Sequence, residues 1–147
     1  MLLPDVNLLI YAHRVDSKYH AFYLEWLEEA ISTSLFALTP MTAAGFLRVV
    51  THPRYPGGQT PYNDAANTLE SIIAHPNFRW VFPGPGHWTI FSRLCSKCNC
   101  TGNLISDAQH AAIAIEHHCK WVTRDTDFGI FRRHGLDLLI LDPDGAA

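Results

Sequence analysis

Short apolar runs alternate along the chain with longer segments in which apolar side chains recur every three to four residues. The short runs predict strands at residues 2–5, 36–38, 78–82, 121–123 and 138–141. The longer segments predict helices at residues 6–13, 17–31, 40–51, 61–74, 87–98 and 106–118. Because strands and helices alternate, the pattern predicts an α/β sandwich with a mainly parallel central sheet.

Three of these helices follow residues that favour helix starts. Ser17 is a predicted N-cap, while Thr39-Pro40 and Thr60-Pro61 each combine a capping hydroxyl with a proline at the first helical position. In the helix after Ser17, one face is expected to pack in the core, and it carries Phe22, Trp26 and Ala30.

The composition is that of an ordinary globular protein. The chain has 147 residues, of which 48% are apolar and 17% charged, so residues 1–147 are expected to form one domain with a frayed tail at about 142–147. Its first residues lack a basic segment followed by a long apolar run, and no apolar stretch approaches the ~20 residues of a membrane span. We therefore expect a cytoplasmic protein without a membrane segment.

The net charge of −3 argues against a protein that attracts nucleic acid over its whole surface. A local basic rim is still compatible with phosphate contacts, and its predicted members are Arg48, Arg54, Lys97, Arg124, Arg132 and Arg133. The charge balance therefore weakens a nucleic-acid hypothesis without excluding it.

Four cysteines raise the question of a structural zinc site. Cys95, Cys98 and Cys100 form a C-x-x-C-x-C cluster, and Cys119 follows two histidines. The second paired arm of a zinc ribbon is missing, and Cys95 and Cys98 have the spacing of neighbours on one helix face. We therefore favour plain reduced thiols over a zinc site.

Carboxylates lie at two predicted strand ends and at the start of the last long helix. Asp5 ends the first strand, Asp125 and Asp127 follow the fourth, and Asp107 lies in the first turn of the helix. Ligands of open α/β sheets bind beyond the carboxyl ends of the strands. We therefore expect Asp5, Asp107 and Asp125 to converge on one metal-binding pocket, with Asp127 in reserve.

Two of these acids have a capping alternative. Asp5 precedes a predicted helix and Asp127 precedes a short helix around Phe128, so either carboxylate can serve as a cap instead of a ligand. Glu116 lies nine residues after Asp107, about half a turn away around the helix, and is excluded from the pocket.

Clustered carboxylates repel one another, and burial raises their pKa, so such a pocket favours a divalent cation that neutralises it. Mg²⁺ prefers one or two carboxylates, several waters and phosphate oxygens, and it activates water for attack on phosphoryl compounds such as phosphodiesters. The side chains expected to support or approach the pocket are Asn7, Asn103, Thr123 and His110. Walker-type, G-x-G-x-x-G and G-x-S-x-G motifs are absent from the sequence, which argues against nucleotide-driven and serine-hydrolase chemistry.

Four segments carry these residues in a characteristic order. They are residues 3–9 (LPDVNLL), 45–54 (GFLRVVTHPR), 102–108 (GNLISDA) and 121–128 (WVTRDTDF). Together they resemble the PIN-domain ribonucleases of the VapC toxin type over essentially the whole chain. The resemblance implies a PIN-like α/β/α sandwich and an Mg²⁺- or Mn²⁺-dependent endoribonuclease that hydrolyses RNA with a metal-activated water. It also implies a homodimer that a VapB-like antitoxin inhibits.

The resemblance implies metal-binding and catalytic roles for Asp5, Asp107 and Asp125, with Asp127 as a further catalytic acid. The basic residues expected to contact RNA phosphates are Arg48, Arg54 and Arg124. Many PIN nucleases carry a glutamate where this chain has Gly45, so one carboxylate is missing. A second hypothesis is therefore a silent PIN-type module that binds RNA or protein, and a third is a metal-dependent phosphatase on another α/β fold.

Aromatic side chains offer a further route to RNA, because bases of single-stranded RNA stack on them. Tyr55, Tyr62, Trp88 and Phe91 are the candidates. We expect Trp88 and Phe91 to belong to the core instead.

Overall fold

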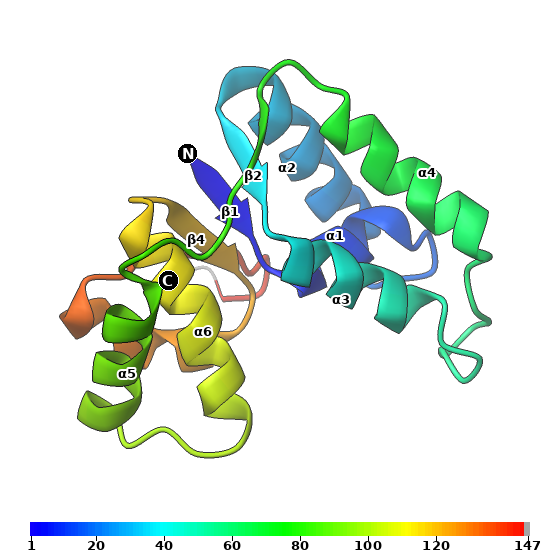
Figure 1. The fold of residues 1–147 in the computed structure, drawn as a ribbon. Helices are drawn as coiled ribbons and strands as arrows, with labels where there is room; N and C mark the ends of the chain where they lie inside the picture. The colour runs from blue at the N-terminus through cyan, green and yellow to red at the C-terminus, as the bar shows by residue number, and fades with distance from the viewer. Residues whose placement is uncertain (146–147) are drawn as a thin grey trace.

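A computed structural model describes residues 1–145, which fold around a central sheet (Figure 1). The sheet has the strand order β3-β2-β1-β4-β5, and every pairing within it is parallel. The strands are β1 (Leu2–Pro4), β2 (Phe36–Leu38), β3 (Phe78–Trp80), β4 (Lys120–Thr123) and β5 (Asp137–Ile140). The prediction of a mainly parallel sheet is confirmed.

Helices cover both faces of the sheet. They are α1 (Val6–His13), α2 (His20–Thr33), α3 (Pro40–Val50), α4 (Tyr62–Ile73), α5 (His87–Lys97) and α6 (Asn103–Glu116), with a 3₁₀ segment, η1 (Thr126–His134), between β4 and β5. Within residues 1–145, no helix is long and apolar enough to cross a bilayer.

Alternation along the strands divides the core into two layers. Leu3 and Trp121 are fully buried on one face, against α5, α6 and η1. Phe36 and Leu38 are fully buried on the other face, against α1 to α4. Side chains of consecutive strand residues point to opposite faces, so both faces of each central strand are apolar. The predicted α/β/α sandwich is confirmed.

The strand order places the predicted site at the middle of one sheet edge. β1 is the central strand and pairs with β4 in a register that sets Pro4 opposite Val122. Pro4, which has no backbone N–H to donate, is the last residue of β1, and the backbone N–H of Asp5 donates to the Val122 carbonyl at 2.8 Å. Asp5 and Thr123 therefore lie side by side at the carboxyl ends of neighbouring strands.

The start of α2 differs from the prediction. The helix begins at His20 after Tyr19, whose left-handed backbone (φ 64°) ends a series of turns, and Ser17 does not cap it. The register within the helix differs as well. Phe22 is 38% exposed, whereas Tyr23 is fully buried and donates its hydroxyl to the Leu141 carbonyl at 2.8 Å. A helix face is wide enough that the sequence alone did not distinguish these adjacent aromatic residues.

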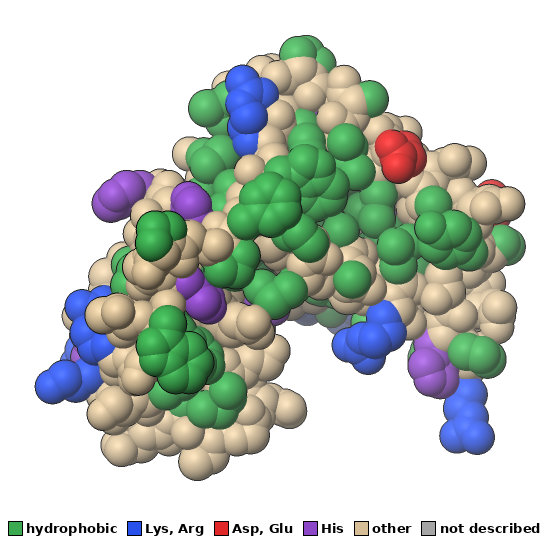
Figure 2. All heavy atoms as spheres, in the orientation of Figure 1, with side chains coloured by type: hydrophobic (Ala, Val, Ile, Leu, Met, Phe, Trp, Pro, Cys, Tyr) green, Lys and Arg blue, Asp and Glu red, His purple; other side chains and the backbone are tan. Residues whose placement is uncertain are grey.

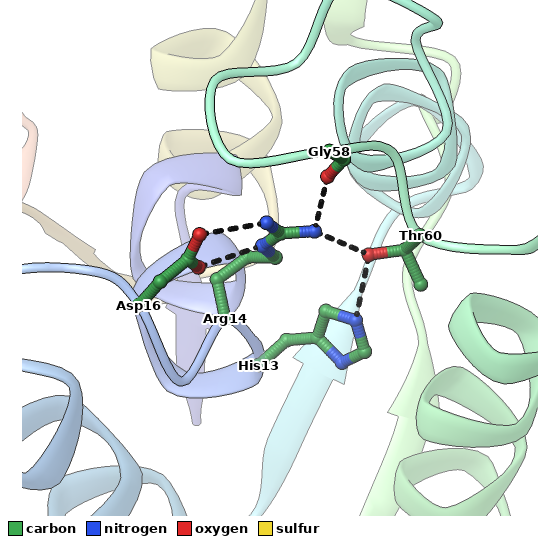
Figure 3. A network of polar contacts seen from close by, with 5 residues as sticks. All are labelled: His13, Arg14, Asp16, Gly58 and Thr60. Carbon is green, nitrogen blue, oxygen red and sulfur yellow. Dashed lines mark hydrogen bonds and ion pairs between the residues drawn. The ribbon is translucent and has the colours of Figure 1, made fainter.

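Thr60 also has a role other than the predicted one. α4 begins at Tyr62 without a side-chain cap. The Thr60 hydroxyl instead accepts a 3.1 Å hydrogen bond from Arg14 and lies 3.4 Å from His13 Nε2 (Figure 3). Arg14 further donates to the Gly58 carbonyl at 2.7 Å and pairs with Asp16 at 2.8 Å. This network fastens the end of α1 to the loop between α3 and α4.

Other boundaries shift by a few residues. β3 ends at Trp80 rather than at residue 82, and α6 begins at Asn103 rather than at Ser106. Asp107 is therefore in the second turn of α6, not in the first. A frayed tail at about 142–147 stays a prediction: Asp142 forms an ion pair with Arg124 at 3.6 Å, and residues 146–147 lie outside the described residues.

Candidate active site

Asp5 lies at the junction of β1 and α1 and uses both carboxylate oxygens. Oδ1 accepts from the Val6 backbone N–H at 2.7 Å, which caps α1, and Oδ2 accepts from the Thr123 hydroxyl at 2.7 Å. Burial raises the pKa of Asp5, although both hydrogen bonds oppose that rise and the nearby Asp125 charge adds to it. The capping alternative is therefore correct, and capping leaves the carboxylate facing the other predicted acids.

Thr123 connects three of the predicted site residues. Its side chain is fully buried, and its hydroxyl oxygen accepts from the Asp125 backbone N–H at 3.0 Å while donating to Asp5. The Asn7 amide nitrogen lies 3.5 Å from the same oxygen. The amide oxygen of Asn7 is buried and has no hydrogen-bond partner in the described part of the chain. An oxygen ligand is thus left unused beside Asp5.

Asp107 faces the same group from α6. Burial raises its pKa, and the charges of Asp125, Asp5 and Asp127 raise it further, to about 6. Like charges act on a pKa only at short range, so Asp107 lies near the other predicted acids.

Asp125 and Asp127 divide their roles differently from the prediction. Asp125 Oδ1 accepts from the Asp127 backbone N–H at 2.9 Å and caps η1, so Asp125 and not Asp127 is the cap. Asp127 is exposed at the rim. Among residues 1–145, no three His, Cys, Asp or Glu side chains stand close enough to bind one ion together. A three-carboxylate metal site therefore stays a prediction.

Glu116 points away from this group, as the helical spacing predicted. Its carboxylate accepts backbone hydrogen bonds from Gly84 and Gly86, both at 2.8 Å. It holds the loop between β3 and α5.

A cavity of about 360 Å³ lies between α3 and α6, and two of its lining residues, Val6 and Ser106, are the sequence neighbours of Asp5 and Asp107. Its lining comprises Val6, Met41, Ala44, Gly45, Arg48, Ser106, Gln109 and His110. Gly45 is the position of the missing glutamate. Sequence reasoning placed His110 near the pocket but missed Ser106 and Gln109, although their spacing from His110 puts all three on one helix face.

The basic residues of the predicted rim have different surroundings. Arg48 lines this cavity and also a second one of about 320 Å³ that contains His52, Arg54 and Tyr55. Arg124 is instead held by Asp142 at 3.6 Å and by Asp144 at 3.9 Å, so its charge is largely compensated. Asn103, the first residue of α6, is exposed.

The remaining predictions concern Trp88, Phe91 and the cysteines. Trp88 is 71% exposed, so its assignment to the core is wrong, whereas Phe91 packs against the core as expected. The four cysteines are free thiols, and Cys100 lies close enough to Cys95 and Cys98 that burial and these neighbours raise its pKa to about 11.

Comparison with known proteins shows the family. A family model of the PIN domain matches residues 2–134. The chain belongs to the PIN-domain family. Ribonuclease VapC43 of Mycobacterium tuberculosis is 39% identical over 142 residues, covering 93% of this chain and 97% of the relative. Ribonuclease VapC25 of the same organism is 36% identical over 132 residues, covering 89% and 93%. Within the PIN family, the chain is therefore a member of the VapC group.

Solved structures show the same PIN fold at low sequence identity. A chain of VapBC2 from Rickettsia felis, crystallised with a DNA fragment from its promoter, matches with a TM-score of 0.70 at 16% identity and covers 96% of this chain and 98% of that one. A chain of VapBC-1 from nontypeable Haemophilus influenzae matches with a TM-score of 0.64 at 15% identity, covering 94% and 96%. These matches support the α/β/α assignment.

Proposed function

We propose that this PIN-domain protein is a metal-dependent endoribonuclease, the toxin of a VapBC-type toxin–antitoxin pair, and that it hydrolyses RNA phosphodiester bonds in the cytoplasm. The observation that carries the proposal is the Thr123 hydroxyl, which hydrogen-bonds to Asp5 at 2.7 Å and to the Asp125 backbone at 3.0 Å. Asp107 lies near both acids, and burial together with the charges of Asp125, Asp5 and Asp127 raises its pKa to about 6. A group of mutually repelling carboxylates is costly for a fold and suits a cationic cofactor. The ribonuclease names of relatives that match nearly the full chain support the substrate class.

The donor atoms suit Mg²⁺ or Mn²⁺. Asp5 and Asp107 would hold the ion, and the unpartnered amide oxygen of Asn7 offers a further oxygen ligand. Mg²⁺ needs one or two carboxylates and completes its shell with waters and phosphate oxygens, so a third protein carboxylate is not required. When bound, such a cation supplies the Lewis-acid chemistry that favours attack of water on a phosphodiester.

The protein side chains have separable tasks in this proposal. Thr123 fixes the rotamer of Asp5 and the backbone of Asp125, so the two acids keep one relative orientation. Arg48 lies at the rim of the adjoining cavity and is placed to bind a flanking phosphate. Asp125 uses Oδ1 in the η1 cap, and its charge raises the pKa of Asp107.

Cleavage of a mixed RNA pool tests the proposal. The wild type, Asp107→Asn and the exposed-charge control Glu70→Gln are assayed with Mg²⁺, with Mn²⁺ and with chelator. We expect metal-dependent cutting by the wild type and by Glu70→Gln, and a loss of about 100-fold or more in Asp107→Asn. Equal cutting by Asp107→Asn would refute the assigned site. A folded wild type that cuts with neither cation would favour the RNA- or protein-binding hypothesis.

We also propose a homodimer and a VapB-like antitoxin as partners. The solved neighbours include a toxin–antitoxin complex from Klebsiella pneumoniae, which supports the second partner. Large apolar side chains are exposed at the end of β3, in the β3–α5 connection and on α5, at Trp80 (40%), Phe82 (54%) and Trp88 (71%). Figure 2 shows apolar side chains gathered on this face. Such a patch is typical of an interaction surface.

Sedimentation of the purified chain over a range of concentrations tests the homodimer. We expect Trp88→Ser to shift the protein toward the monomer, and Tyr62→Ser, which removes an exposed aromatic residue from α4, to leave the dimer intact. A monomeric wild type at all concentrations would refute it.

A further inference from the structure

Side chains of α1, α3 and α6 line the cavity between α3 and α6. Met41, Gly45 and Arg48 recur at helical spacing on one face of α3, while Ser106, Gln109 and His110 do so on α6. Val6 and Ser106 each adjoin a carboxylate in sequence, Asp5 and Asp107. With a volume of about 360 Å³, the cavity lies within the range of small-ligand sites.

Gly45 keeps this cavity open. A Cβ added at Gly45 would lie 3.0 Å from the Val6 Cγ2 methyl group, closer than an ordinary contact. Both residues line the cavity, so any side chain at position 45 must displace Val6 or occupy the space itself. Glycine at position 45 therefore has two effects: it removes one carboxylate of the set that many PIN nucleases carry, and it leaves space in the cavity.

The lining combines an apolar wall with groups that both donate and accept hydrogen bonds. Met41 and Val6 supply apolar surface, and the Gln109 amide and the Ser106 hydroxyl supply donors and acceptors. The ring of His110 is stacked on Trp121 with centroids 5.1 Å apart, and its Nδ1 is enclosed without a partner in the described residues. Nε2 is the ring nitrogen left for a ligand in the cavity.

These groups suit a neutral, planar ligand better than an anion. Val6 and Ser106 of the lining are the sequence neighbours of Asp5 and Asp107, so a phosphate placed inside the cavity would lie near two carboxylates. The cation of the lining, Arg48, is exposed and also faces the second cavity, with His52 and Arg54. Figure 2 shows basic and histidine side chains below the end of α3 and the following loop, where the backbone of a bound strand would continue.

We propose that the cavity between α3 and α6 receives one unpaired nucleobase of the RNA strand and so sets the base preference at the cleavage site. This inference rests on the proposed ribonuclease function and names the part of the RNA, one nucleobase, that the protein recognises. The Gln109 amide and the His110 imidazole contact the base edge, Met41 and Val6 contact its face, and Arg48 binds the adjoining phosphate. Gly45 is a specificity residue because its lack of a side chain admits the base.

Two measurements test the pocket independently of turnover. The first is binding of AMP, GMP, CMP and UMP to the metal-free protein, with ribose 5-phosphate as the probe that lacks a base. The second is the base preference around the cut in a mixed RNA pool. Both are made on the wild type, on Gln109→Ala and on Gly45→Leu, with Gln59→Ala as the matched control in a loop outside this cavity.

We expect one nucleotide to bind at least about tenfold more tightly than ribose 5-phosphate, and Gln109→Ala to weaken it about tenfold. In cleavage, Gln109→Ala should raise KM, largely retain kcat and relax the preference at one position, while Gln59→Ala changes neither. Gly45→Leu should weaken nucleotide binding by filling the space. Thermal unfolding reports whether each variant is folded.

The outcomes separate this pocket from the ribonuclease itself. A wild type that cuts RNA, with base preference and nucleotide affinity unchanged in Gln109→Ala, would overturn the pocket and leave the ribonuclease intact. A wild type that binds nucleotides through Gln109 but cuts no RNA would overturn the ribonuclease and leave the pocket. Binding of ribose 5-phosphate as tight as that of every nucleotide would overturn base recognition.

Discussion

The Thr123 hydroxyl donates a 2.7 Å hydrogen bond to Oδ2 of Asp5. The two residues are 118 positions apart in sequence and meet because β1 and β4 are adjacent parallel strands that end together. The same hydroxyl accepts from the Asp125 backbone at 3.0 Å. One buried side chain therefore fixes the positions of two acids that leave the same edge of the sheet.

Thr123→Val should keep the packing of this side chain and remove its hydroxyl. A hydrogen bond to a buried carboxylate contributes about 1.5–3 kcal/mol, and loss of a group that orients a metal ligand typically costs about 10–100-fold in metal affinity or activity. We expect a loss of that order in cleavage and a higher Mg²⁺ requirement. Titration of Mg²⁺ in the RNA assay measures both. Thr123→Ser restores the hydroxyl and should recover most of the activity, and its failure to do so would contradict a positioning role.

Asp107→Asn should stabilise the protein while abolishing cleavage. The folded pKa of Asp107 is raised from 3.8 to about 6, so its stabilising contribution is full below about pH 4 and is lost as the pH rises through about 6. A shift of this size corresponds to at most about 3 kcal/mol, and solvent screening at this partly exposed carboxyl reduces it to about 1 kcal/mol.

Urea unfolding without divalent cations measures this effect. We expect Asp107→Asn to be more stable than the wild type by about 1 kcal/mol near pH 7.5 and equal to it near pH 4. Glu70→Gln, which removes one exposed charge from α4, is the control and should change little. A less stable Asp107→Asn near pH 7.5 would show that the carboxylate is not repelled by its neighbours.

His110 has the opposite pH dependence. Burial lowers its pKa from 6.5 to about 4, so its contribution to stability is full above about pH 6.5 and is lost as the pH falls through about 4. In the wild type, this loss is partly offset by Asp107 and Asp5, whose raised pKa values favour the folded state in acid. Asp107→Asn should therefore show a steeper fall of unfolding free energy between pH 6.5 and 4 than the wild type.

The added variant His110→Phe identifies the source of that slope. Phenylalanine keeps an aromatic ring against Trp121 and cannot bind a proton. We expect the double variant Asp107→Asn, His110→Phe to lose most of the acid slope, by about 2–3 kcal/mol over this range. An unchanged slope would assign the titration to another group.

The sequence predicted the fold because its elements depend on short-range rules. Apolar runs and their spacing fix the alternation of strands and helices, and parallel strands bring Asp5 and Thr123 to one edge. The start of α2 was missed because Tyr19 adopts a left-handed backbone, which no capping rule predicts for tyrosine. Thr60 was misassigned because Arg14, 46 positions away, binds its hydroxyl.

In the candidate site, too, local patterns predicted some features, whereas contacts between distant residues were missed. Helical spacing was sufficient to exclude Glu116, yet it gave no sign of the backbone amides that Glu116 binds. The absence of a side chain at Gly45 was visible in the sequence as a missing carboxylate. That this absence leaves a cavity depends on Val6, which packs across from α1 and whose distance no local pattern encodes.

Glu116→Ala should destabilise the fold without changing the chemistry of cleavage. The variant leaves the backbone N–H groups of Gly84 and Gly86 without their acceptor, and hydrogen bonds to a charged group contribute about 1.5–3 kcal/mol each. We expect a loss of about 2–3 kcal/mol in urea unfolding, with kcat unchanged at a temperature where the variant is folded. A selective fall in kcat would place Glu116 in the active site after all.

Gly45→Glu tests what the missing carboxylate means for this chain. Its Cβ would press on the Val6 methyl group at 3.0 Å, and overpacking of this kind costs about 1–3 kcal/mol, partly offset by the higher helix propensity of glutamate. The new charge would also join carboxylates that already raise the pKa of Asp107. Without cations, we expect Gly45→Glu to be less stable than Gly45→Gln, which has the same size and no charge. With Mn²⁺ the order should reverse, because an additional carboxylate raises the affinity of the folded state for the ion. Thermal unfolding across a Mn²⁺ titration measures both states, and an equal Mn²⁺ response in the two variants would show that position 45 does not face the metal site.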